Sequence, residues 1–122
     1  MTENNWNYKF VAPAICYAGL IFFLSSLPSS VVPNLGISFG DLIIHFFEYS
    51  VFGYLLGLAI MQSPSKINWK NFLAIFIIGS LYAASDEYHQ SFVEGRFSEV
   101  SDFLADSAGV ILGLGGFVIR KK

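Results

Sequence analysis

The sequence predicts an all-α integral membrane protein, a bundle of four transmembrane helices in one domain (residues 1–122), and two observations lead to this fold class. Apolar residues make up 54% of the chain and charged residues only 13%, whereas soluble domains hold roughly 45–50% and about 25%. A core this small cannot hide 13 Phe and 6 Tyr from water. The apolar residues also gather in four segments that approach the roughly 20 helical residues needed to cross a bilayer.

The first two segments are residues 10–27 and 41–61. Pro13 is tolerable in the first turns of a helix. We expect the first segment to be an uncleaved anchor and not a signal peptide, because its leader holds a single Lys9 offset by Glu3.

The third and fourth segments frame the unusually polar stretch "DEYHQSFVEGR", residues 86–96. The third has a short apolar run, 72–84, so a helix that crosses the membrane must extend from about Trp69 to about His89. The fourth covers 102–120. The polar stretch therefore carries the third helix out of the bilayer and turns toward the fourth.

The positions of Lys and Arg predict the orientation, because cytoplasmic loops hold the excess of these residues. Only Arg96 lies in the loops expected outside. The other six lie at the opposite ends of the segments: Lys9, Lys66, Lys70, Arg120, Lys121 and Lys122. Both termini are therefore expected in the cytoplasm. All acidic residues but Glu3 fall in the outer loops or the outer halves of the helices.

Composition also excludes some classes of protein and site. No basic patch of the kind that binds nucleic acid is present. Cys16 is the single cysteine and cannot form an intrachain disulfide.

The pairs Gly53-x-x-x-Gly57 and Gly109-x-x-x-Gly113 are typical of close helix packing. The turn-rich outer loop, 27–40, either lies on the membrane surface or covers a site.

Polar residues on the second segment recur at the spacing of one helix face. Asp41, His45 and Glu48 stand at i, i+4 and i+7. His45 is expected about 6 Å and Glu48 about 10 Å below Asp41, at about 1.5 Å per residue.

The third and fourth segments bring polar residues to the same level. Asp86, His89 and Gln90 share a face at the outer end of the third helix, and Asp102 and Asp106 share one at the start of the fourth. Ionisable groups inside a span cost on the order of 2.5–3.5 kcal/mol each, so they normally face the bundle interior and mark function. The alternative is that they only hydrogen-bond the helices together.

The remaining charged residues near the outer face are interpreted from their place in the loop. By this criterion we expect the side chains of three acids to be exposed to solvent: Glu87, Glu94 and Glu99. Arg96 either closes the 90–101 loop through a salt bridge or grips a carboxylate or phosphate.

Carboxylates beside imidazoles suit two kinds of chemistry. They can act as general acids and bases, or they can bind a divalent metal, for which His45-x-x-Glu48 has ligand spacing on one helix face. The acids would repel an anionic lipid head group unless a metal or protons neutralise the site.

The run from Asp41 through His45 and Tyr49 to Gly53, then "DEYHQSFVEGR", Ser98, Asp102 and Gly109, resembles the VanZ-like family of small bacterial membrane proteins. The namesake of that family is associated with resistance to the glycopeptide teicoplanin. The resemblance covers about residues 41–113 and implies a helical membrane protein with its motif residues grouped together: Asp41, His45, Asp86, Glu87, His89, Gln90, Arg96 and Asp102. Family members often have Asn at the position of Asp106 and Pro at that of Glu94. Asp106 adds a negative charge that favours a metal or a shared proton.

We expect a multi-pass protein of the bacterial cytoplasmic membrane whose outward-facing polar site binds or modifies an envelope lipid or a lipid-linked cell-wall precursor. The alternatives are a non-enzymatic module that binds such a lipid or the antibiotic, and a proton or cation carrier. The inner halves of the helices hold no acid or His after Glu48, which disfavours a carrier. The candidate catalytic residues are Asp41, His45, Glu48, Asp86, Glu87, His89, Asp102 and Asp106, and the candidate ligand-binding residues are Gln90 and Arg96.

Overall fold

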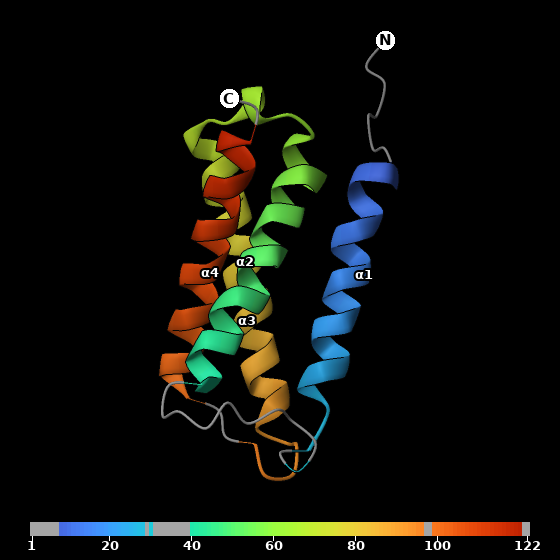
Figure 1. Ribbon diagram of the computed structural model, residues 1–122, viewed down its shortest axis with the longest axis vertical. Coiled ribbons are helices and arrows are strands. Elements are labelled where there is room, and N and C mark those ends of the chain that lie inside the picture. Colours follow the sequence, from blue (N-terminus) through green and yellow to red (C-terminus); the bar gives the residue numbers. More distant parts are fainter. Residues whose placement is uncertain (1–7, 29, 31–39, 97–98, 121–122) are drawn as a thin grey trace.

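Four long helices run antiparallel to their neighbours in the chain and form a bundle (Figure 1). The computed structural model describes residues 8–28, 30, 40–96 and 99–120. The elements are α1 (Tyr8–Ser25), α2 (Gly40–Met61), the 3-10 turn η2 (Pro64–Lys66), α3 (Trp69–Gln90) and α4 (Val100–Ile119). All four predicted helices are therefore confirmed, and the third does extend to the polar stretch. Most of the predicted outer loop lies outside the described residues.

Three of the helices are long and apolar enough to cross a membrane: α1, α2 from Leu42 onward, and α4. α3 has 22 residues, as many as α2. It carries Lys70 near its start and Asp86 and Glu87 near its end, which lower its mean hydropathy. α1 begins at the end of the bundle where α4 finishes (Figure 1).

The most extensive helix contact joins α2 and α4, and glycines make it possible. A Cβ atom at Gly53 would overlap the Val110 carbonyl oxygen, and one at Gly113 would overlap that of Ser50. At Gly57 a Cβ would press against the Phe117 ring at 3.0 Å. The glycine pairs therefore act in helix packing, as their spacing predicts.

α1 packs mainly on α2 and has fewer contacts with α3. The Tyr17 hydroxyl donates a hydrogen bond to the Glu48 carbonyl oxygen at 2.9 Å, and the Tyr82 hydroxyl of α3 donates one to the Ala18 carbonyl oxygen. Ile21 is fully buried against the other helices. These contacts fix the depth of α1 beside the end of α3 that carries the polar residues.

Three local features set the connections at the two ends of α3. α2 ends at Met61, where Gln62 adopts a left-handed φ of 64°, and α3 begins after Asn68, whose side chain accepts a hydrogen bond from the Asn71 amide at 2.9 Å. Beyond α3 the chain turns at Gly95, which has a φ of 76°.

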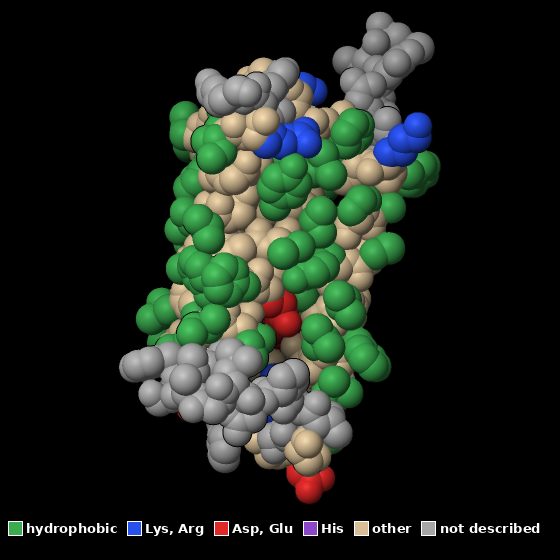
Figure 2. All heavy atoms as spheres, viewed as in Figure 1, with side chains coloured by type: hydrophobic (Ala, Val, Ile, Leu, Met, Phe, Trp, Pro, Cys, Tyr) green, Lys and Arg blue, Asp and Glu red, His purple; other side chains and the backbone are tan. Residues whose placement is uncertain are grey.

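Apolar side chains cover the visible face of the bundle between its two ends (Figure 2). Lys and Arg side chains gather at the end where α4 finishes, and acidic side chains appear in the other half (Figure 2). The elements agree with this view, because Lys9 lies in α1, Lys66 in η2, Lys70 in α3 and Arg120 after α4, all near that end. The bundle is thus apolar around its middle and polarised along its axis.

Candidate functional site

Three helices bring a histidine and two carboxyl groups together inside the bundle. His45 Nδ1 of α2 lies 2.8 Å from Asp106 Oδ1 of α4 and 3.7 Å from Glu87 Oε1 of α3. Asp106 has no solvent exposure, and Glu87 and His45 are exposed by 5% and 7%. We call these three residues the His45–Glu87–Asp106 cluster. Two of them, His45 and Asp106, were expected to face the bundle interior, because ionisable groups inside a span are costly.

The burial of Glu87 corrects an expectation from the sequence. Its position beside the outer loop favoured a solvated side chain, but the last turn of α3 is still packed in the bundle, so Glu87 lies between α3 and α4. Glu94 and Glu99 are exposed, as expected. The resemblance, which groups Glu87 with the other motif residues, was the better guide at this position.

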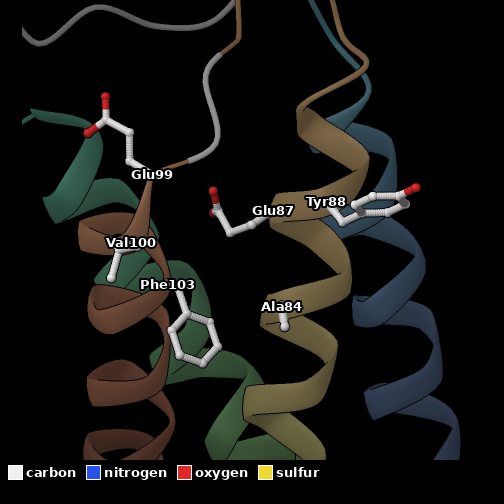
Figure 3. Close-up of a pocket in the computed structure, with 6 residues that line it drawn as sticks. All are labelled: Ala84, Glu87, Tyr88, Glu99, Val100 and Phe103. Carbon is white, nitrogen blue, oxygen red and sulfur yellow. The ribbon is translucent and has the colours of Figure 1, made fainter.

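A pocket of about 350 Å³ opens between α3 and α4 beside the cluster (Figure 3). Ala84 and Phe103 form apolar walls with Val100, and Glu87 points from α3 toward α4 within it. Tyr88 also borders the pocket, although its ring points away from α4 in this view. Glu87 therefore belongs both to an open pocket and to the buried cluster.

A second buried interaction lies next to the cluster. The Tyr49 hydroxyl of α2 donates a hydrogen bond to Asp86 Oδ2 of α3 at 3.0 Å. Tyr49 follows His45 by one helical turn and is fully buried. Glu48, one residue earlier, is half-buried and close enough for the charges of His45, Asp86 and Asp106 to act on it.

Asp102 completes the acidic surroundings on the α4 side. It is buried one turn before Asp106, and its charge acts on His45, Glu87 and Asp106 alike. The predicted shared face of Asp102 and Asp106 is thus present.

The other two predicted polar residues of α3 turn toward α1. The His89 ring stacks on Phe22 with centroids 4.4 Å apart, and its Nε2 lies 2.8 Å from Ser26 Oγ. The Gln90 amide donates a hydrogen bond to Ser25 Oγ at 3.3 Å. The described contacts therefore place His89 and Gln90 against α1, apart from the His45–Glu87–Asp106 cluster and its acidic neighbours Glu48, Asp86 and Asp102.

Arg96 ties the connection after α3 to the end of α1. Its Nη1 donates a hydrogen bond to the Leu27 carbonyl oxygen at 2.9 Å. Within the described ranges no acidic side chain forms an ion pair with Arg96. Asp41 lies in the first turn of α2, and its side chain falls outside the described part of the chain.

Three hydroxyl residues of this region were missing from the predicted site. Tyr49 stands four residues after His45, so the helical period puts it on the same face, and it belongs to the run that carries the family resemblance. Ser25 and Ser26 lie at the end of the first apolar run, and this position at the outer end of the helix is the feature of the sequence that could have pointed to them. Each now has a hydrogen-bond partner on α3.

The cluster has the composition of either a proton-transfer site or a metal site. An imidazole within hydrogen-bond distance of a carboxyl group can move a proton to or from a bound molecule. One potential ligand atom from each of His45, Glu87 and Asp106 lies within 4.8 Å of the others, which also suits a cation. Both uses need access for a bound molecule, and Glu87 is the residue of the cluster that also lines the pocket.

Comparison with known proteins now places the chain. No curated protein and no solved structure matches it. The sequence profile of the VanZ/LLP1 family matches residues 10–121, which includes α1 as well as the motif-bearing helices. The predicted resemblance is thereby confirmed and extended to the first helix. With three helices able to cross a membrane, the chain is a helical membrane protein that belongs to the VanZ/LLP1 family.

Proposed function

We propose that this protein crosses the bacterial cytoplasmic membrane with all four helices and binds or modifies an envelope lipid, or a lipid-linked cell-wall precursor, in the outer leaflet. Two features support the topology. α3 exposes a row of large apolar side chains to the surroundings of the bundle: Phe72, Leu73, Ile77, Ile78 and Leu81. The Lys and Arg residues at the opposite end from the cluster favour a cytoplasmic location for that end.

The pocket between α3 and α4 is the observation that carries the lipid proposal. Its volume of about 350 Å³ is within the usual range of roughly 300–1,000 Å³ for small-molecule sites. Ala84, Val100 and Phe103 offer apolar contact, and Glu87 offers a polar end. A molecule with acyl chains beside the bundle and a polar head between the helices matches this combination.

The cluster determines which chemical groups lie near such a head group. His45 and Asp106, hydrogen-bonded to each other, can hold or pass a proton at the inner side of Glu87. Hydroxyl or amine groups of a head group suit acidic surroundings, whereas a phosphate needs a cation or protons beside it. The reaction class favoured here is therefore acid–base chemistry at the polar head, assisted by a proton held between His45 and Asp106 or by a cation bound in its place.

Filling the pocket tests the proposal. Ala84→Trp places a large ring at the pocket wall, while Ala108→Trp puts the same ring on an exposed position of α4 that does not line the pocket. Each protein is purified in mild detergent, and the lipids that remain bound are identified by mass spectrometry against the whole-membrane extract. We expect one lipid class to be enriched on the wild type and on Ala108→Trp and lost from Ala84→Trp. Bound lipids that mirror the membrane composition in all three proteins would contradict the proposal.

A module that binds the lipid or the antibiotic without reaction uses the same pocket. The two functions are separated by incubating the enriched lipid with the protein and following its mass, because only an enzyme changes it. A link to glycopeptide resistance is tested separately: expression of the wild type should raise the teicoplanin concentration that inhibits growth, and expression of Ala84→Trp should not.

A further inference from the structure

The His45–Glu87–Asp106 cluster has the arrangement of a cation site. The three residues come from three different helices, so their convergence is a property of the fold and not of local sequence. His45 Nδ1 lies 2.8 Å from Asp106 Oδ1 and 3.7 Å from Glu87 Oε1, and one atom from each residue lies within 4.8 Å of the other two. Two ligands of one metal ion at bonds of about 2.0–2.2 Å stand at most about 4.4 Å apart, so the widest pair needs to close by no more than a few tenths of an ångström.

A second observation concerns hydrogen bonding. Both carboxyl oxygens of Glu87 and Oδ2 of Asp106 are buried and have no hydrogen-bond partner among the described residues. Buried polar atoms in native proteins nearly always have a partner, which is often an ion or water where no protein group serves. Three such oxygens beside one imidazole indicate a positively charged ligand.

Charge balance is consistent with the same ligand. Two carboxylates and a protonated imidazole still leave one negative charge, and burying an unpaired charge is costly. Two carboxylates, a neutral imidazole and a divalent cation sum to zero. Asp102 and Asp86 lie close enough to act on the cluster and make the local potential more negative.

We propose that His45, Glu87 and Asp106 bind one divalent transition-metal ion, Zn²⁺ or Mn²⁺. A nitrogen ligand with two carboxylates suits these ions, whereas Ca²⁺ and Mg²⁺ prefer oxygen ligands alone and in greater number. At tetrahedral angles, bonds of about 2.0–2.1 Å separate two ligand atoms by about 3.3 Å. His45 Nδ1 and Asp106 Oδ1 therefore move apart by a few tenths of an ångström when the ion binds.

Three protein ligands leave a coordination position for a further group, as in catalytic metal sites. Glu87 belongs to the cluster and also lines the pocket between α3 and α4, so a molecule in that pocket is the group best placed to reach this position. A hydroxyl or phosphate oxygen from a molecule in the pocket can fill it. Metal binding itself does not depend on the lipid proposal, since it involves only the three side chains.

Metal content and affinity test this inference. Tag-free wild-type protein in detergent is stripped with a chelator, dialysed against Zn²⁺, Mn²⁺, Mg²⁺ or Ca²⁺ in turn, and assayed by elemental mass spectrometry and by thermal unfolding. We expect about one Zn²⁺ or Mn²⁺ per chain, with a higher melting temperature, because a ligand of the folded state stabilises it. Mg²⁺ and Ca²⁺ should produce neither effect.

Near-isosteric variants assign the ligands. Asp106→Asn and Glu87→Gln should each weaken metal binding by more than about tenfold, an effect that outer-shell partners of a metal already reach. Both should stay folded, because each removes a buried charge. Glu99→Gln, an exposed acid at the same end of the bundle, is the matched control and should bind like the wild type. A wild type that binds none of the four ions, or variants that bind as tightly as the wild type, would overturn the inference.

Discussion

At the scale of single residues, hydrogen-bonded pairs of polar groups occupy the core of this bundle. His45 pairs with Asp106, Tyr49 with Asp86, and Ser80 of α3 with Ser107 of α4 at 3.2 Å. Each pair joins two helices. Hydrogen bonds between membrane helices average only about 0.6 kcal/mol, but leaving a buried acceptor without its partner costs about 1–3 kcal/mol. The pairs therefore specify the arrangement of the helices more than they drive its formation.

Removal of the Tyr49 hydroxyl measures how much the Tyr49–Asp86 hydrogen bond contributes to stability. Tyr49→Phe keeps the ring, which packs against Phe52 with centroids 5.8 Å apart, but leaves Asp86 Oδ2 without this donor. We expect the free energy of unfolding in detergent to fall by about 1–2 kcal/mol, measured by denaturant titration. Tyr88→Phe removes a hydroxyl from an exposed ring on the same helix as Asp86 and should change it by less than about 0.5 kcal/mol. Equal effects of the two substitutions would contradict a stabilising Tyr49–Asp86 bond.

At the scale of helices, α2 and α4 make the most extensive contact in the bundle. Gly53, Gly109 and Gly113 let the two backbones meet, since a Cβ at any of the three would overlap a backbone carbonyl oxygen of the facing helix. The same contact holds His45 and Asp106 at hydrogen-bond distance. Close packing of small residues is therefore connected directly to the geometry of the cluster.

Adding one methyl group to this contact should separate the helices. Gly113→Ala places its Cβ onto the Ser50 carbonyl oxygen, and overpacking of this kind costs about 1–3 kcal/mol. Gly115→Ala, two residues along α4, meets nothing within 4 Å and should leave stability equal or higher, because Ala favours a helix over Gly by about 1 kcal/mol. Thermal unfolding of both variants checks this expectation. A Gly113→Ala protein as stable as Gly115→Ala would show that the helices are not held this closely.

The positions of the helices could be predicted from the sequence, but the contacts between particular helices could not. Apolar segment length and the extension of the third segment to His89 follow from the thickness of the bilayer, and helical period placed His45, Asp102 and Asp106 inward. The side of α3 that packs against α1 depends on how all the helices are arranged, and it cannot be read from the sequence of any single helix. For that reason His89 was expected beside His45 but stacks on Phe22. Burial of Glu87 depends likewise on how far α4 packs along α3.

At the scale of the whole molecule, the bundle separates its charges along its axis. The cluster and its acidic neighbours lie near the start of α4, and Lys9, Lys70 and Arg120 lie at the other end. Arg120 is held there, with its guanidinium 4.6 Å from the centre of the Phe117 ring and a hydrogen bond to the Tyr54 hydroxyl at 3.3 Å. Cationic side chains resist translocation during insertion, so this asymmetry selects one orientation of the protein in the membrane.

Two exposed serines at the ends of α3 allow the orientation and the crossing of α3 to be tested together. Ser65 lies in η2 before the helix and Ser91 directly follows it. In a Cys16→Ser background, Ser91→Cys should react with a membrane-impermeant thiol reagent added to intact cells. Ser65→Cys should react only after the cells are lysed, because we propose that the Lys-rich end faces the cytoplasm. Labelling of position 65 alone in intact cells would mean the opposite orientation, and labelling of both positions would mean that α3 does not cross the membrane. The first result would place the His45–Glu87–Asp106 cluster in the inner leaflet, and the second would show that α3 is not one of the membrane-spanning helices. In both cases an envelope lipid in the outer leaflet could not reach the cluster as proposed.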